Sequence, residues 1–274
     1  PLRYRAIPEI AYKGDCTILF GTSTFLSFYA RYANPMDFSR LRHVISGGEK
    51  LSPEVSRIWM EKFGVRIMEG SQVVATSGGH ALRSITVRSG AAIETIPVNT
   101  LAVSGGWNPT VHLTCHLAGR PVWNDTLAAF VPGAAPRGMI VAGAANGAMS
   151  LARCLAEGAH AGAAAADATG HASTPFEPPR ADDEPCSVTP LWHVAGSTGK
   201  AFVDLQHDVT ADDLALAQRE GFGAPEHLKR YTTLGMATDQ GKTSGVPALG
   251  IMAALTGRSI PETGTTTFRP PYVP

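Results

Sequence analysis

A proline-rich polar segment divides the chain and most limits how it can fold. Residues 167–199 carry Pro175, Pro178, Pro179, Pro185 and Pro190 among Ser, Thr, Asp and Glu side chains. Such a composition buries too little apolar surface to offset the entropy lost on ordering. We therefore predict a linker there, with no chemistry of its own. The whole chain has 274 residues, enough for roughly two domains of about 100–200 residues each.

The segment before the linker reads as α/β. In residues 1–70, a short strand over 41–46, a helix over 51–63 and another strand over 65–68 form one predicted unit, with Ser52 as the helix cap. In residues 71–166, the apolar pattern predicts strands over 82–87, 96–104 and 139–143, followed by an alanine-rich helix over about 148–166.

Residues 200–274 predict a small, mainly helical domain. Thr210 and Asp213 have the spacing of a capping box at the start of a helix. Two further helices are predicted over 228–231 and 246–255. The expected fold class is α/β: partial modules over 1–70 and 71–166, the linker 167–199, and this helical domain.

Charge and composition exclude several classes of protein. The formal net charge is zero, which gives no electrostatic basis for binding nucleic acid or an anionic membrane. No apolar run reaches the roughly 18 residues of a spanning helix, and the N-terminus does not resemble a signal peptide. Four scattered cysteines predict reduced thiols in a cytoplasmic protein. Because the chain begins with Pro1, we expect an internal fragment.

Motifs for catalysis and metal binding are missing. There is no GxSxG elbow and no arrangement that compels a catalytic triad, so we predict no catalytic residue. His112 and His116 have the i, i+4 spacing of two ligands on one helix face. The glutamate of the HExxH motif is not between them, so no metal is expected.

Three segments are candidates for ligand binding. Glycine-rich turns at 47–50 and 143–147 lie between a predicted strand and a helix, but neither is GxGxxG. Such turns are more often structural than ligand sites. The run 231–244 carries hydroxyls, an amide and a lysine among glycines, which suits an anionic or heteroaromatic ligand such as a flavin. A capped helix pair with a solvated loop explains this run equally well.

Three blocks of sequence, residues 200–210, 226–244 and 255–272, resemble the alpha subunit of heterotetrameric sarcosine oxidase. Residues 101–109 and 139–158 are similar to its dinucleotide-binding half, so the resemblance covers about 73–274.

The resemblance implies oxidative demethylation of sarcosine to glycine, with electrons passing to oxygen. It implies NAD on the alpha subunit, FAD, a covalently held FMN involving the beta subunit, and gamma and delta partners. The cofactor contacts that it implies are Gly105, Trp107, Gly143, Asn146, Gly235, Met236, Gln240, Lys242 and Thr243.

The sequence lacks several motifs of this family, so we expect the chain alone to bind fewer cofactors than the family does. Residues 200–274 resemble a ferredoxin-like module, yet 204–207 and 239–242 stand where cluster cysteines would be, so no iron-sulfur cluster is predicted. The βαβ unit with GxGxxG is missing, and NAD or FAD binding by this chain alone is not expected. The family's folate-binding domain would begin where the chain stops, at 272–274.

Residues 1–70 resemble a different family, the acyl-ACP synthetase/2-acylglycerophosphoethanolamine acyltransferases, over 16–26, 34–38, 41–51 and 59–70. Their YGVTE signature does not follow Gly70, so adenylation is not expected. The sequence therefore predicts a sarcosine oxidase alpha-subunit component that is incomplete and inactive alone. A fragment of an acyl-ACP synthetase and a non-functional chimera are the alternatives. Poor packing is expected at the junction 70–77, and one continuous sheet across it would contradict the chimera.

Overall fold

The structure is a computed structural model that describes residues 4–46, 51–64, 68, 70–103, 106–172, 176–184 and 186–269. The chain divides into two compact units. The first comprises Pro1–Ser71 with Arg88–Ile93, and the second comprises Gln72–Val87 with Glu94–Pro274.

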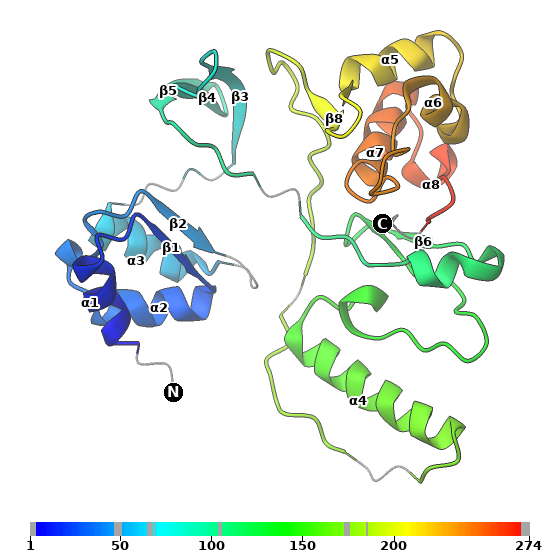
Figure 1. The fold of residues 1–274 in the computed structure, drawn as a ribbon, viewed down its shortest axis with the longest axis horizontal. Coiled ribbons are helices and arrows are strands. Elements are labelled where there is room, and N and C mark those ends of the chain that lie inside the picture. Colours follow the sequence, from blue (N-terminus) through cyan, green and yellow to red (C-terminus); the bar gives the residue numbers. More distant parts are fainter. Residues whose placement is uncertain are drawn as a thin grey trace. The chain divides into compact units, whose positions relative to one another are not determined.

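The first unit is built around a parallel strand pair. Its elements in chain order are α1 (Ala6–Lys13), β1 (Ile18–Gly21), α2 (Ser23–Tyr32), η1 (Pro35–Phe38), β2 (His43–Ser46) and α3 (Pro53–Phe63). Strands β1 and β2 pair in parallel, with Ile18 opposite His43, and α2 lies in the connection between them (Figure 1). A parallel pair needs such a crossover, so this part has the predicted α/β character.

Aromatic packing joins α2 and α3. The Trp59 ring is buried against Phe38, with ring centroids 5.1 Å apart, and its Nε1 donates to the carbonyl oxygen of Leu26 at 3.1 Å. The predicted helix over 51–63 is confirmed, since the Ser52 hydroxyl caps it by accepting from the Val55 N–H at 3.2 Å. The predicted turn at 47–50 and most of the predicted strand over 65–68 lie outside the described residues.

A separate three-stranded sheet follows in sequence. Strands β3 (Ser71–Ser77), β4 (Ser84–Ser89) and β5 (Ala92–Pro97) form a sheet in the order β3-β4-β5, distinct from the β1-β2 sheet. The described strands thus do not form one sheet across the junction at 70–77. The strand predicted over 96–104 is wrong over 98–103, because β5 ends at Pro97, and Ser104 lies outside the described residues.

The middle of the second unit contains η2 (His112–Ala118), β6 (Val122–Asn124), β7 (Ala129–Val131), η3 (Gly143–Asn146) and α4 (Leu151–Ala168). The strand predicted over 139–143 is wrong, since residues 139–142 belong to no strand and Gly143 opens a 3-10 turn at φ +67°. An apolar run becomes a strand only where another strand pairs with it. The alanine-rich helix is confirmed, but it begins later, with Ser150 as its cap.

The C-terminal part contains β8 (Phe202–Asp204), β9 (Val209–Thr210), α5 (Ala211–Arg219), α6 (Pro225–Thr232), α7 (Gly245–Thr256) and α8 (Ile260–Thr263). The three predicted helices and the capping box of Thr210 and Asp213 are confirmed. The short β8-β9 hairpin was not predicted.

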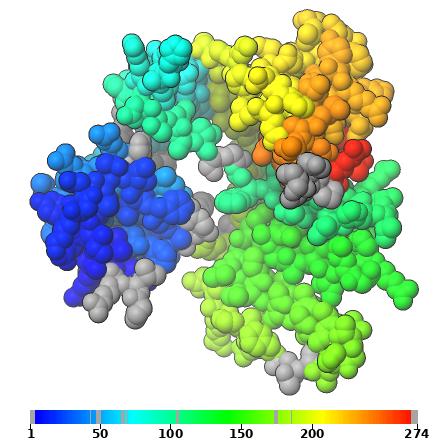
Figure 2. Space-filling model, viewed as in Figure 1, coloured from blue at the N-terminus to red at the C-terminus, as the bar shows by residue number. Residues whose placement is uncertain are grey.

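Helix α7 is the centre of this part. It contacts α5 and α8, and α5 contacts α6 (Figure 1). Seven of its residues are buried, as expected for a helix that is apolar on all sides. In the space-filling view, the yellow, orange and red residues form one packed body (Figure 2). Within the described residues, no helix is both long and apolar enough to cross a membrane.

The predicted linker contains one residue that belongs to this core. Trp192 packs against the buried cluster around α7, so close that a Cβ added to Gly250 would lie 2.3 Å from its Cγ. The composition of the 33 residues as a whole did not predict this contact, because a single large aromatic side chain can anchor a segment that is otherwise polar. Helix α4 extends into the segment as far as Ala168, and from Thr169 on its described residues form neither helix nor strand.

Candidate functional site

A cavity of about 60 Å³ lies at the amino end of α7, inside the second unit. Helix α7 and the loop before it, residues 233–244, provide much of its wall. Other parts come from η2, β7 and the segment after α8. The apolar side of the wall includes Phe130, Leu249, Met252 and Phe268, and the polar side includes His112 and Lys242.

Two glycines allow the loop 233–244 to fold back on itself. Gly235 and Gly241 have φ values of +62° and +77°, and a Cβ added to Gly235 would lie 2.9 Å from the Cα of Gly241. Thr233 and Gln240 also have positive φ, a conformation that costs free energy in residues with a side chain. Strained backbone of this kind persists only where the surroundings hold it, and it is common at binding sites.

Asp204 holds the loop in place. Its carboxyl group is buried, with 1% of the side chain exposed, and it accepts hydrogen bonds from the N–H of Gly235 at 2.7 Å and of Gln206 at 2.9 Å. Buried carboxyl groups need such partners. Asp204, the last residue of β8, therefore holds the backbone of Gly235 in place.

A second carboxylate, Asp239, organises the other end of the loop. Its oxygens accept from the Thr243 hydroxyl at 2.8 Å, the Thr243 N–H at 3.2 Å and the Gly241 N–H at 3.1 Å. Burial by itself raises the pKa of Asp239, but these hydrogen bonds and the charge of Lys242 outweigh it and hold that pKa below its usual value.

Lys242 brings a positive charge to the cavity. Its Nζ donates to the carbonyl oxygen of Arg269 at 3.2 Å. Burial lowers the pKa of Lys242, and the charge of Asp239 opposes that shift. Lys229 of α6 lines the cavity as well, and no Asp or Glu side chain is among the described residues that do, so the cavity favours an anion.

Two polar atoms at this site have no hydrogen-bond partner among the described residues. They are Nδ1 of His112, which lines the cavity, and Oγ of Ser244, which is fully buried directly before α7. Oγ of Ser244 lies 3.7 Å from the position of a Cβ on Gly235. Burial, followed by the charge of Lys242, lowers the pKa of His112. Buried polar groups are normally paired, so both atoms require an explanation.

His112 and His116 do not share a helix face, which corrects the spacing argument. The helical turn breaks at His116, where ψ is 156°, and Leu117 adopts φ +56°. No group of three potential metal ligands is found among the described residues. The His112 ring instead packs near Phe268, with ring centroids 5.7 Å apart.

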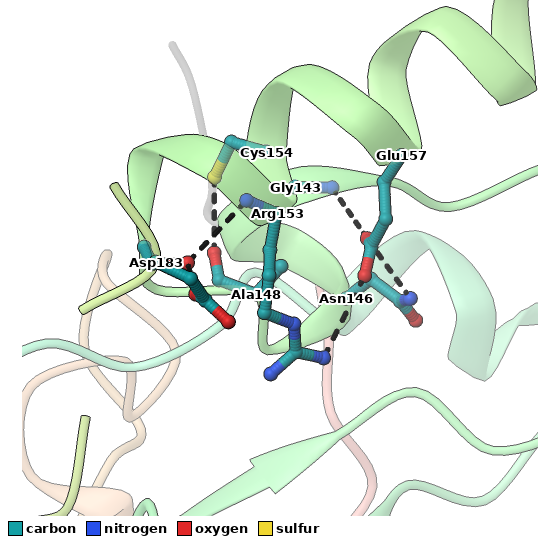
Figure 3. Close-up of polar contacts among 8 residues, drawn as sticks. Gly143, Asn146, Ala148, Arg153, Cys154, Glu157 and Asp183 are labelled. Carbon is teal, nitrogen blue, oxygen red and sulfur yellow. Dashed lines mark hydrogen bonds and ion pairs between the residues drawn. The ribbon is translucent and has the colours of Figure 1, made fainter. Parts of the chain in front are cut away.

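The other predicted ligand site, the turn at 143–147, has its donors paired within the chain. The Gly143 N–H donates to Oε2 of Glu157 at 2.9 Å, and Nδ2 of Asn146 donates to the same oxygen at 3.2 Å (Figure 3). Glu157 extends from α4 and also lies 3.8 Å from the Arg153 guanidinium. A side-chain carboxylate therefore already occupies the position that a phosphate would take on these donors.

The structure brings together only part of the predicted cofactor contacts. The residues at the cavity are Gly235, Gln240 and Lys242. Met236 and Trp107 are exposed instead, by 49% and 83%, and Thr243 is bonded to Asp239. Gly143 and Asn146 belong to the separate turn, and Gly105 lies outside the described residues.

Sequence reasoning missed His112 and Phe268 as residues of the cavity, and it did not single out Ser244 within the run 231–244. His112 was considered only as a metal ligand. A serine directly before a helix normally caps it, and nothing in the sequence indicates that the Ser244 hydroxyl makes no capping bond. Phe268 lies within the tail that carries the family resemblance.

Comparison with known proteins shows which part of the chain is similar to sarcosine oxidase. Residues 198–274 match the family model described as sarcosine oxidase A3 domain. The sarcosine oxidase subunit alpha of Rhizobium meliloti (strain 1021) is 45% identical over 211 residues, which cover 76% of this chain and 21% of that protein. The same subunit of Corynebacterium sp. (strain P-1) is 41% identical over 228 residues, or 77% of this chain and 24% of that protein.

A solved structure shares the fold. The crystal structure of L-proline dehydrogenase from P. horikoshii superposes with a TM-score of 0.58 over 80% of this chain and 46% of that one, at 19% identity. The chain spans about a fifth to a quarter of the length of the curated relatives that it matches. The predicted resemblance is thereby confirmed: about three quarters of the chain is similar to sarcosine oxidase alpha subunits, and residues 198–274 match the A3 domain.

Proposed function

We propose that the chain is the alpha-subunit component of a heterotetrameric-type sarcosine oxidase, a flavin-dependent oxidoreductase that demethylates sarcosine to glycine. The observation that carries the proposal is the identity of 40–45% to sarcosine oxidase alpha subunits over 76–77% of the chain. The component acts with a beta subunit, with gamma and delta subunits completing the enzyme. It is incomplete and inactive alone.

The loop 233–244 is the proposed contact with flavin at the interface with the beta subunit. A cavity of about 60 Å³ is far below the roughly 300 Å³ of the smallest typical ligand pockets, so an isoalloxazine ring does not enter it. The exposed outer side of the loop, which includes Met236, is the surface that such a ring would meet. FMN or FAD would supply the hydride-accepting chemistry, and this chain would position one face of it.

A dinucleotide fits the described residues less well. At the turn 143–147, the pyrophosphate of NAD or FAD would have to displace Glu157 from Gly143 and Asn146. We therefore assign NAD and FAD binding to the assembled enzyme rather than to this chain alone. An iron-sulfur cluster is not part of the proposal, because thiolate ligands do not stand at 204–207 or 239–242.

Co-expression with a sarcosine oxidase beta subunit tests the proposal. We expect the two chains to co-purify with bound flavin, detected by its visible absorbance, and the chain expressed alone to carry none. Met236→Ala should reduce the flavin retained by the complex, and Met60→Ala, an exposed methionine of α3, is the matched control. A beta subunit that neither co-purifies nor gains flavin from this chain would contradict the proposal.

A chimera with an acyl-ACP synthetase fragment is the second candidate. The division of the chain at Ser71 supports it, because it falls beside the boundary predicted at residue 70. ATP-pyrophosphate exchange with a fatty acid tests for adenylation, and we expect none. A cytoplasmic location is also proposed, supported by four free cysteines, which are usual in a reducing compartment.

A further inference from the structure

The amino end of α7 combines three features that favour an anion. Helix α7 has twelve residues, and the first N–H groups of a helix and its dipole attract negative charge. Gly245 and Val246, the first residues of α7, line the cavity. Ser244 at the cap position makes no capping hydrogen bond, although the Gly245 N–H already donates to the carbonyl oxygen of Gly241 at 2.8 Å and Pro247 has no N–H.

Unpartnered groups supply an independent observation. Three buried side-chain atoms lack a hydrogen-bond partner among the described residues, and two of them, on His112 and Ser244, lie at this cavity or beside its glycines. Leaving a buried donor or acceptor unpaired costs about 1–3 kcal/mol. Of the two residues, His112 lines the cavity, so its Nδ1 is the unpaired atom that a polar ligand there would satisfy.

The cavity's size limits the ligand. A cavity needs about 10–15 Å³ of this kind of volume for each water molecule, so about 60 Å³ holds roughly four to six heavy atoms. Its apolar wall, with Phe130, Leu249 and Met252, suits a short hydrocarbon group. A phosphate of similar size would lack donors on that side, and the ammonium of an amino acid would lack a carboxylate partner.

We propose that the cavity at the amino end of α7 binds a small carboxylate with a short apolar tail, held by Lys242 and His112. Lys242 provides the charge together with Lys229 of α6, which also lines the cavity. His112 donates from Nδ1 in the tautomer that carries its proton there. The site requires neither flavin nor a beta subunit, so it can fail or succeed independently of the proposed function.

Titration of the purified full chain with propionate, glycine and inorganic phosphate tests the site. We expect saturable propionate binding by calorimetry, with a shift of the His112 ring signals in the NMR spectrum. Lys242→Gln should weaken propionate binding by about ten- to a hundredfold, the usual range for a charge-assisted hydrogen bond. Lys200→Gln, at an exposed lysine outside the cavity, should leave it unchanged.

Each other outcome overturns the proposal. Absence of saturable propionate binding to the wild-type chain would exclude the carboxylate. Tighter binding of phosphate or glycine than of propionate would assign the cavity to a different ligand class. If Lys242→Gln and Lys200→Gln weakened propionate binding equally, the loss of affinity would reflect the net charge of the chain and not a contact made by Lys242. The wild-type titration alone can contradict the proposal, so the test does not depend on whether a variant folds.

Discussion

The two glycine-rich turns of the second unit differ in how their polar groups are paired. At 143–147, the donors of Gly143 and Asn146 share one oxygen of Glu157. At 233–244, carboxyl groups of Asp204 and Asp239 hold the backbone, while His112 and Ser244 remain unpartnered. At the first turn, the donors of Gly143 and Asn146 are paired within the chain. At the second turn, the backbone is held in place, but two neighbouring side chains still lack hydrogen-bond partners among the described residues.

The difference shows why glycine content alone does not identify a ligand site. Both turns use glycine at positive φ and both precede a helix. Only the second combines a cavity, a nearby positive charge and unpaired buried atoms. Binding capacity therefore depends on which donors remain after the chain has satisfied its own groups.

The largest effect is expected from Gly235→Ala. The new Cβ would lie 2.9 Å from the Gly241 Cα at a φ of +62°, so steric overlap adds to backbone strain. We expect a loss of about 3 kcal/mol in the free energy of unfolding, measured by urea denaturation. Gly223→Ala, with open space around the new Cβ, should change stability by less than about 1 kcal/mol. Equal stability of the two variants would contradict the close contact of the glycine pair.

Asp204→Ala should have the next largest effect. It removes the acceptor of the Gly235 and Gln206 N–H groups and should cost about 2–3 kcal/mol, by the same measurement. Asp212→Ala removes an exposed acidic residue from the first turn of α5 and should cost about 0.3–1 kcal/mol. If both substitutions cost the same, Asp204 does not fix the loop.

The sequence predicted the helices well because their signals are local. The caps at Ser52 and Thr210 and the left-handed glycine after α7 at Gly257 each depend on a few neighbouring residues. The strand predicted over 139–143 failed because a strand depends on a partner far away in sequence.

The site was only half predictable for a similar reason. The polar run 231–244 was recognised as a candidate, and Gly235, Gln240 and Lys242 do line the cavity. His112 and Phe268 reach it from segments more than 100 residues apart, and nothing in either segment indicates the other. The pairing of Gly143 and Asn146 with Glu157 likewise follows from the fold of α4 and not from any motif.

Glu157→Ala should have a smaller effect and would sharpen the contrast between the turns. The Glu157 side chain is 27% exposed, so water replaces part of what the carboxylate provides, and we expect a loss of about 1 kcal/mol. Thermal unfolding measures it, and Glu177→Ala, at an exposed glutamate, is the control. If the variant is as stable as wild type, Glu157 does not satisfy this turn.

The smallest effect is expected from the pH dependence of stability through His112. Burial and the charge of Lys242 lower the pKa of His112 in the folded chain below its ordinary value of 6.5. The unfolded chain then binds this proton more readily, so the free energy of unfolding falls as the pH drops from about 6.5 towards the lowered pKa. His112→Gln should remove that part of the slope in urea denaturation across this pH range. Propionate should reduce the slope in the wild type as well, because a carboxylate beside the ring raises the pKa of His112. A slope that is the same in wild type and His112→Gln would mean that the ring is not desolvated, and the strongest reason for a ligand at the second turn would be lost.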